Sequence, residues 1–244
     1  MNDSELARQI ADSAGRLLID LRQSGLFEGK ALGKLGDQLA NSFIMQALRA
    51  HRPGDAILSE EEKDSAGRLG AQRVWIVDPL DGTREYGEAR ADWAVHVALA
   101  IDGAATLGAV AMPGLPLTFS SGDAPTRPRH KGKLRMVVSR TRPAAEAVAV
   151  AEALGAELIP MGSAGAKVMA VVRGEADIYL HSGGQYEWDS CAPVAVAQAA
   201  GLHVSRMDGG ALRYNQPNTY MPDLLVCVRE HAARVIELAA RKRS

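Results

Sequence analysis

The most informative stretch of this chain reads Val74-Trp75-Ile76-Val77-Asp78-Pro79-Leu80-Asp81-Gly82-Thr83, an apolar run that leads into two carboxylates, a proline and a glycine. The apolar residues predict a buried strand, and ligands of open α/β sheets collect where such strands end. Pro79 fixes its own φ and lacks an N–H donor, so we expect a sharp turn that leaves Asp78, the Leu80 carbonyl and Asp81 on one side. Hard cations such as Mg²⁺ choose oxygen ligands of this kind. The alternative is an Asp-Pro turn before a capped helix.

The next two residues, Gly82 and Thr83, extend this prediction from a metal to a phosphate. A glycine permits close approach of the backbone to a ligand, and the free N–H groups at a helix N-terminus attract a phosphate. The threonine hydroxyl can hydrogen-bond a water in the same place. We therefore expect both residues to contact the phosphate group of a substrate.

Two other acidic stretches are candidates for the same site. The apolar run 56–58 leads to Glu60-Glu61-Glu62, so one glutamate is expected at the same sheet edge, and Glu187-Trp188-Asp189-Ser190 places Asp189 at the start of an apolar helix. Each stretch has an ordinary explanation by itself, because successive glutamates usually form a solvated face and an aspartate is a common N-cap. Together with the first stretch, they predict a cluster of carboxylates drawn from three distant segments.

Composition excludes several classes of protein. The chain has 244 residues, of which 47% are hydrophobic, so it can bury a substantial core. Its formal net charge is −1, from 28 basic and 29 acidic residues, so no overall field attracts a nucleic acid polymer or an anionic membrane. The polar N-terminal residues predict no secretory signal, and no apolar run is long enough for a transmembrane helix. Cys191 and Cys227 are expected to be free thiols, which favours a cytoplasmic protein.

Hydrophobic periodicity predicts stacked layers of helix and sheet. A helix over 6–21, capped by Asp3 or Ser4, and a second helix around 39–48 precede a meander of strands with a hairpin turn at 101–103. The second half alternates helices and strands. The expected strands are 74–77, 94–100, 105–111, 117–120, 134–138, 156–159, 177–181, 202–205 and 224–228, and the later helices are 143–154, 165–173, 190–200 and 231–240. The Pro-, Arg- and Lys-rich segment 122–133 separates two predicted domains, residues 1–122 and 134–244.

Residues 75–83 fit the first signature of a known family almost residue for residue, and Trp188-Asp189 followed by small residues fits its second signature. The chain thus resembles, over nearly its whole length, the inositol monophosphatase superfamily of Mg²⁺-dependent, lithium-sensitive phosphatases. It looks closest to the CysQ-type 3′(2′),5′-bisphosphate nucleotidases, on the basis of Glu187-Trp188-Asp189, Gly162-Ser163, Lys167, Ser139-Arg140 and Tyr214-Asn215. The resemblance implies an α/β fold, the α-β-α-β-α sandwich of the inositol monophosphatase and fructose bisphosphatase type.

The resemblance also implies a metal site at the junction of the two halves. Glu60, Asp78 and the Leu80 carbonyl would hold one Mg²⁺, and Asp78, Asp81 and Asp189 would hold a second. Two such ions stabilise the attacking and leaving oxygens of an in-line displacement and lower the pKa of a bound water. A third ion that joins during turnover is left open.

The same resemblance assigns the orientation of the attacking water to Thr83 paired with Asp37, and it counts Glu60 among the catalytic residues. Asp37 by itself also fits a first-turn helix acid. A serine stands where relatives commonly carry glycine before the metal-binding glutamate, so the choice between Glu60 and Glu61 stays open. The segment 29–36 lacks the Lys-x-x-x-Ser-Pro loop of many relatives, which leaves the third ion undecided.

Substrate selection is expected to depend on residues outside the metal site. Arginine forks match phosphate oxygens, so Arg140 and Arg142 would hold a second phosphate. Histidine often follows the Ser-Arg-Ser segment of nucleotidases, whereas this chain has Thr141-Arg142, so a sugar substrate stays open. The basic residues of segment 127–133 are expected to lie in a solvated loop, and electrostatic steering of the phosphate is the alternative. His96 is expected to have a structural role. The predicted substrate contacts are Gly82, Thr83, Ser139, Arg140, Ser163, Lys167 and Asp189.

The leading hypothesis is hydrolysis of 3′-phosphoadenosine 5′-phosphate to AMP and phosphate in sulfur metabolism, by a metal-activated water. Inositol-1-phosphate or fructose-1,6-bisphosphate phosphatase activity is the alternative within the same class. A non-catalytic module that binds metal or nucleotide is the alternative from a different class. The expected partner is a small phosphorylated molecule, and the resemblance adds a homodimer.

Overall fold

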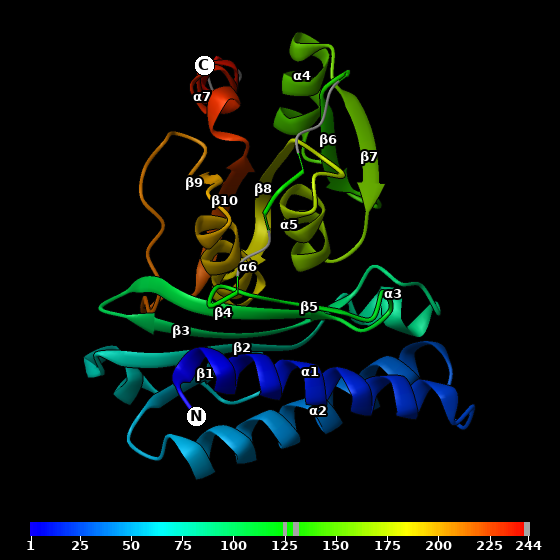
Figure 1. Ribbon diagram of the computed structural model, residues 1–244, viewed down its shortest axis with the longest axis vertical. Helices are drawn as coiled ribbons and strands as arrows, with labels where there is room; N and C mark the ends of the chain where they lie inside the picture. The colour runs from blue at the N-terminus through cyan, green and yellow to red at the C-terminus, as the bar shows by residue number, and fades with distance from the viewer. Residues whose placement is uncertain (124–125, 129–131, 242–244) are drawn as a thin grey trace.

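The computed structural model describes residues 1–123, 126–128 and 132–241. Five layers follow one another along the long axis of the molecule (Figure 1): two helices, a sheet, two helices, a second sheet and two further helices. Three clusters of buried apolar side chains fill the spaces between these layers. The predicted α-β-α-β-α sandwich is confirmed.

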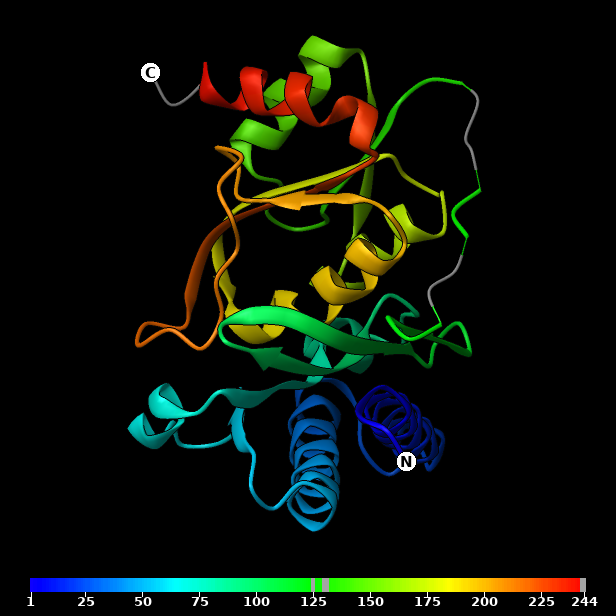
Figure 2. The same cartoon turned by 60° about the vertical axis from the view of Figure 1, so that its left-hand side comes forward.

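The first layer contains α1 (Asp3–Gln23) and α2 (Gly29–His51). Both views place these helices on the same face of the first sheet (Figures 1 and 2). The cap of α1 differs from the prediction. Asn2 is the N-cap, its side chain accepts a hydrogen bond from the Glu5 N–H, and the Glu5 carboxylate accepts one from the Asn2 N–H. This reciprocal pair satisfies two backbone N–H groups at the helix start. Asp3 and Ser4 lie inside the helix and do not cap it.

The first sheet has the order β1-β2-β3-β4-β5. The short β1 is parallel to β2, and the other neighbours are antiparallel. Asp102 and Gly103 both have positive φ, 51° and 74°, as the predicted hairpin turn requires. The strands are β1 (Ala56–Ser59), β2 (Arg73–Asp81), β3 (Ala94–Ile101), β4 (Ala104–Met112) and β5 (Leu117–Ser120), with the short helices η1 (Ala66–Gly70) and α3 (Thr83–Gly87).

The second sheet has the order β7-β6-β8-β10-β9 and lies beyond a layer made of α5 (Ala164–Val172) and α6 (Glu187–Ala199). Its outer face is covered by α4 (Ala145–Leu154) and α7 (Ala232–Ala240), which follows the short helix η2 (Arg229–His231). The strands are β6 (Arg135–Ser139), β7 (Glu157–Met161), β8 (Ile178–Tyr186), β9 (His203–Ser205) and β10 (Tyr220–Cys227). The helices α5 and α6 are therefore shared by both sheets, and their N-termini face the end of β2.

The described residues test two further predictions, one about the cysteines and one about the basic segment 127–133. Cys191 and Cys227 are buried free thiols, as predicted. Arg127 was expected in a solvated loop, but its guanidinium pairs with Asp177 at 2.8 Å and donates to the Val171 and Ala176 carbonyls. Residues 129–131 of that loop lie outside the described residues. No helix in the described part of the chain is both long and apolar enough to cross a membrane.

Candidate active site

A bulge at the end of β2 places two aspartates on one side of the strand. Asp78 pairs with His96 and Asp81 pairs with Ala94. Over this length β2 advances by three residues while β3 advances by two, which is a β-bulge. In a regular strand residues three apart face opposite sides, and the extra residue cancels that alternation. The sharp turn expected at Pro79 is therefore wrong, because the strand continues through the proline to Asp81. The Leu80 N–H donates to Asp78 Oδ1 at 3.0 Å, which fixes the Asp78 side chain.

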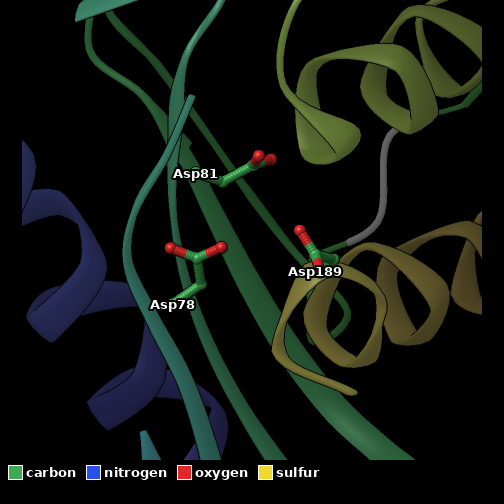
Figure 3. Close-up of side chains that lie close together, drawn as sticks. All are labelled: Asp78, Asp81 and Asp189. Carbon is green, nitrogen blue, oxygen red and sulfur yellow. The ribbon is translucent and has the colours of Figure 1, made fainter. Parts of the chain in front are cut away.

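Asp189 reaches the same place from the other half of the chain. It is the third residue of α6, its Oδ2 accepts a hydrogen bond of 2.7 Å from the Tyr186 N–H, and Tyr186 is the N-cap. One carboxylate oxygen from each of Asp78, Asp81 and Asp189 lies within 4.8 Å of the others. Figure 3 shows the three side chains converging between β2, α5 and α6. The distant acidic stretches thus meet at one point.

Burial and mutual repulsion make this cluster unfavourable without a cation. Burial raises the pKa of Asp78 well above its usual range, and the charges of Glu60, Asp81 and Asp189 raise it further. Burial and Asp81 raise the pKa of Asp189 to about 7. Carboxylates that are buried next to other carboxylates bind either a proton or a metal ion, because each reduces the buried negative charge. Hard oxygen donors in this number fit Mg²⁺.

Asp81 behaves differently, because α5 and His96 compensate its charge. Burial alone would raise its pKa, but hydrogen bonds and charges from His96, Ser163 and Lys167 lower it to about 2. Its carboxylate accepts hydrogen bonds from Ser163 Oγ at 2.5 Å, the Gly165 N–H at 2.6 Å and the Ala164 N–H at 3.0 Å. The N–H groups at the start of a helix attract an anion in this way. Asp81 is therefore ionised and held in place.

Glu60 completes the acidic group from the end of β1. It borders solvent, yet desolvation of its carboxyl group and the charge of Asp37 raise its pKa to about 7, and it interacts directly with Asp78. Glu61 acts on Asp37 instead, and Glu62 accepts a hydrogen bond from Asn41. The structure therefore brings Glu60 to the aspartates, and its role as the ligand stays a prediction.

Thr83 and Asp37 form a pair next to the cluster. Thr83 Oγ1 lies 3.2 Å from Asp37 Oδ2 and 3.1 Å from the Leu80 carbonyl, and its single proton serves one of them at a time. Burial, followed by the charge of Glu61, raises the pKa of Asp37 to about 7. Asp37 Oδ1 is buried and has no hydrogen-bond partner among the described residues. An unused acceptor beside a hydroxyl is what the orientation of a water requires.

Gly82 adopts the conformation that the turn between β2 and α3 demands. Its φ is +91°, a left-handed value, and a Cβ there would lie 3.2 Å from the side chains of Ser163 and Trp93. The glycine thus permits the close approach of the β2 end to the start of α5. Its contact with a phosphate stays a prediction.

The other predicted substrate residues line a pocket of about 510 Å³ on the α5 side, which we call the arginine pocket. Arg140 is held there by Glu85 at 2.8 Å and Glu88 at 2.9 Å, whereas the Arg142 guanidinium has no partner among the described side chains. Ser139 accepts a hydrogen bond from the Arg142 N–H at 3.2 Å. The arginine pocket is lined by Arg84, Glu85, Ser139, Arg140, Thr141, Arg142, Gly162, Ser163 and Lys167.

Lys167 and Ser163 have structural contacts that sequence reasoning missed. Lys167 Nζ is buried and donates to the Gly162 carbonyl at 2.8 Å and to the Ser163 carbonyl at 2.6 Å. Ser163 is the N-cap of α5, and its hydroxyl also bonds Asp81. Both side chains thus support the helix start that holds Asp81, and their contacts with a substrate stay predictions. Arg84 was also missed, although its position directly after Thr83 was a usable signal.

The sequence predicts a structural role for His96, and the contacts of this side chain connect two parts of the proposed metal site. Its ring is fully buried, with Nδ1 3.0 Å from the Trp188 carbonyl and Nε2 3.3 Å from Asp81 Oδ2. Gly165 leaves room for the ring, because a Cβ there would lie 2.1 Å from His96 Nε2. His96 thus connects the Asp81 carboxylate to the helix turn that carries Asp189.

We expect His96→Asn to weaken metal binding by about 10- to 100-fold, since partners that orient ligating groups typically contribute this much. The asparagine amide can still donate to the Trp188 carbonyl, but it does not reach Asp81. Titration calorimetry with Mg²⁺ measures the effect. His203→Asn, on β9 away from the cluster, is the control, and equal Mg²⁺ affinity in both variants would contradict the prediction.

The metal-free protein is expected to lose stability as the pH rises from about 4 to 7. Asp37, Glu60 and Asp189 have folded-state pKa values of about 7, above their ordinary values of 3.8 to 4.5, so the folded state binds more protons than the unfolded state across this window. Stability is therefore present at low pH and lost as these groups ionise. We expect a loss of about 2 kcal/mol, roughly 4–8 °C in Tm for a chain of this size. Melting in EDTA measures it, and Mg²⁺ should flatten the decline.

Comparison with known proteins decides the family. The profile described as the inositol monophosphatase family matches residues 30–244. The chain belongs to the inositol monophosphatase family. This member is 48% identical to the "3′-phosphoadenosine 5′-phosphate phosphatase" of Mycobacterium leprae, with 93% of this chain and 89% of the relative covered. It is 30% identical to the "3′(2′),5′-bisphosphate nucleotidase CysQ" of Escherichia coli K12, with 76% and 80% covered.

Solved structures of the inositol monophosphatase family share the fold. CysQ from Bacteroides thetaiotaomicron superposes with a TM-score of 0.83 at 24% identity and covers 93% of this chain and 97% of its own. The inositol monophosphatase from Anabaena superposes with a TM-score of 0.80 at 21% identity, with 98% and 95% covered. At these identities the likeness concerns the fold alone, and the resemblance stated from the sequence is confirmed.

Proposed function

We propose that this protein is a Mg²⁺-dependent phosphatase that hydrolyses 3′-phosphoadenosine 5′-phosphate to AMP and phosphate. The observation that carries the proposal is the 48% identity, over nearly the full length of both chains, to a relative named for this activity. The convergence of Asp78, Asp81 and Asp189 beside the Thr83 and Asp37 pair supports it, because a pure binding site has no use for a water-orienting pair.

The residues fit a two-ion arrangement. Glu60, Asp78 and the Leu80 carbonyl would hold one Mg²⁺, and Asp78, Asp81 and Asp189 the other. When bound, the ions supply Lewis-acid stabilisation of the attacking and leaving oxygens and lower the pKa of the attacking water. The raised pKa values of Asp78 and Asp189 support a cation here, since its charge replaces the protons that these carboxyl groups otherwise favour.

Asp37 and Thr83 would hold the attacking water. If the Thr83 hydroxyl donates to Asp37 Oδ2, its oxygen can accept a hydrogen bond from one O–H of the water, and the unpartnered Asp37 Oδ1 can accept one from the other O–H. The water oxygen then bonds to phosphorus as the bond from phosphorus to the nucleoside O3′ breaks. One water proton ends on the departing O3′ and the remaining one on the phosphate, so atoms and charges balance.

The arginine pocket would select a substrate with a second phosphate. Arg142, in the loop between β6 and α4, keeps its guanidinium free of other described side chains, while Arg140 is fixed by two glutamates. A fixed arginine beside a free one suits an anion that arrives with the substrate. The proposal places the enzyme in sulfur metabolism in the cytoplasm, where the two free thiols would persist. A homodimer stays a prediction.

A substrate panel tests the proposal. Phosphate release is measured at controlled Mg²⁺ from 3′-phosphoadenosine 5′-phosphate, inositol-1-phosphate and fructose-1,6-bisphosphate, with EDTA as the metal-free control. We expect kcat/KM to be highest for the nucleotide and to vanish in EDTA. A higher value for either sugar phosphate would reassign the substrate, and no release from any of the three would favour the non-catalytic binding module.

A further inference from the structure

A second cavity, of about 710 Å³, adjoins the Thr83 and Asp37 pair. We call it the lysine cavity, and its walls include Lys30, Lys34, Asp37, Glu61, Thr83 and Arg84. Lys30 and Lys34 lie one helical turn apart at the start of α2. Both lysines are exposed, and neither has a hydrogen bond or an ion pair with another described residue. The cavity thus carries two ammonium groups that are available to an anion.

The first turns of α2 carry residues that a helix start disfavours. The first turn has no acidic residue, and the N-cap Glu28 makes no side-chain hydrogen bond to the free N–H groups. The N-terminal end of a helix is electropositive, so cations there are unfavourable. Two lysines in this position, without a compensating contact, are a local conflict of the kind that occurs at functional sites.

Glycine contacts hold these turns next to the water-orienting pair. A Cβ on Gly33 would lie 2.7 Å from Thr83 Cγ2, and a Cβ on Gly87 would lie 2.5 Å from the Gly29 carbonyl. Only glycine allows helices to approach this closely. The backbone that carries Lys30 and Lys34 is therefore packed against α3, at the residue whose hydroxyl bonds Asp37.

An in-line displacement separates the two products in space. A water held by Asp37 and Thr83 attacks phosphorus from their side, so the bond to the nucleoside oxygen breaks on the opposite side. The lysine cavity contains Asp37 and Thr83, whereas the arginine pocket contains Ser163 and the residues expected to hold the nucleotide. Arg84 lines both cavities and therefore stands between them.

Resting on the proposed function, we infer that the lysine cavity binds inorganic phosphate and is the route by which it departs, while the nucleoside product leaves through the arginine pocket. Ammonium groups attract phosphate as point charges without fixing a bidentate geometry, which suits an anion in transit. Three acidic residues also line the cavity. Glu88 is paired with Arg84 at 3.2 Å and with Arg140 at 2.9 Å. Asp37 and Glu61 lie close enough to Glu60 to act on its charge, so the proposed cations would offset their charge as well.

Titration calorimetry of inorganic phosphate into the Mg²⁺-loaded protein tests this inference without any turnover. Its failure is therefore distinguishable from a failure of the proposed function. In the double variant Lys30→Gln/Lys34→Gln, phosphate binding should weaken by about tenfold, because charge-assisted hydrogen bonds are lost. AMP binding should not change. Lys63→Gln, at an exposed lysine that lines neither cavity, is the matched control, and Lys30→Arg/Lys34→Arg should retain phosphate binding.

Product inhibition gives the second measurement. The inhibition constant of phosphate should rise about tenfold in the double glutamine variant, in line with the loss of affinity, while KM and the inhibition constant of AMP stay the same. Equal phosphate affinity in the double variant and the wild type would overturn the inference. So would weaker AMP binding with unchanged phosphate binding, since the lysines would then contact the nucleotide. Melting curves verify the fold, and removal of exposed lysines from a helix N-terminus should not lower Tm.

Discussion

Asp78→Asn is expected to abolish phosphatase activity while stabilising the metal-free protein above neutral pH. Asp78 is the one side chain proposed to contact both ions, so the loss of its charge should lower kcat/KM by roughly 10³-fold or more. The same carboxyl group is buried among Glu60, Asp81 and Asp189, which raise its pKa far above the usual range. Asparagine has the same shape, and its oxygen can still accept the Leu80 N–H. It therefore removes repulsion without removing a contact.

Thermal melting in EDTA at two pH values measures the stability effect of Asp78→Asn. At pH 8.5 the variant should be more stable than the wild type by about 1–3 kcal/mol, because a buried carboxylate without a counter-charge is costly. At pH 5.5 Asp78 of the wild type is protonated and carries no charge, so the difference should shrink. Mg²⁺ should raise the Tm of the wild type but not of the variant. Asp20→Asn, on the exposed face of α1, is the control. A variant that is less stable at both pH values would refute this account of the cluster.

Local sequence patterns predicted the layers well, because each layer depends on which face of an element is apolar. The strand 94–100 and the helix 190–200, for example, correspond closely to β3 and α6. The end of β2 was the exception, since Pro79 reads locally as a strand breaker. β1 pairs with β2 only as far as Val77, so Pro79 has no neighbour on that side that needs its N–H. The bulge then places Asp78 and Asp81 together, which a regular alternation would not.

The residues of the acidic cluster were predictable from the two signatures, but the hydrogen bonds and contacts that hold each carboxylate in place were not. The hydrogen bonds from α5 to Asp81 span 82 to 84 residues of sequence, and the contact of His96 with the Trp188 carbonyl spans 92. No periodicity or spacing reports such pairs, because they arise only when the two sheets share a middle layer. The sequence therefore predicted Ser163 and Lys167 as substrate-binding residues. Their contacts with the start of α5 and with Asp81 are visible only in the three-dimensional structure.

Thr83→Val is expected to lower kcat by about 10²- to 10³-fold while Mg²⁺ affinity stays near the wild-type value, as is typical for loss of a group that positions a proton transfer. Valine keeps the branched shape that packs against Gly33 but has no hydroxyl to bridge Asp37 and the Leu80 carbonyl. Single-turnover phosphate release measures the chemical step, and calorimetry measures the metal affinity. Loss of both together would mean that Thr83 supports the metal site rather than the water.

Thr83→Ser separates the hydroxyl from the packing of the methyl group. Serine keeps the oxygen and lacks the methyl group that lies against Gly33, so it should retain most of the wild-type kcat with some loss of stability. The raised pKa of Asp37, about 7, predicts a further difference. In the wild type and the serine variant kcat should rise with pH as Asp37 becomes an acceptor. The valine variant should have a flatter profile, because the acceptor is no longer coupled to a hydroxyl. Valine and serine variants with equal activity would show that the threonine acts by its shape, and the water would then need another partner.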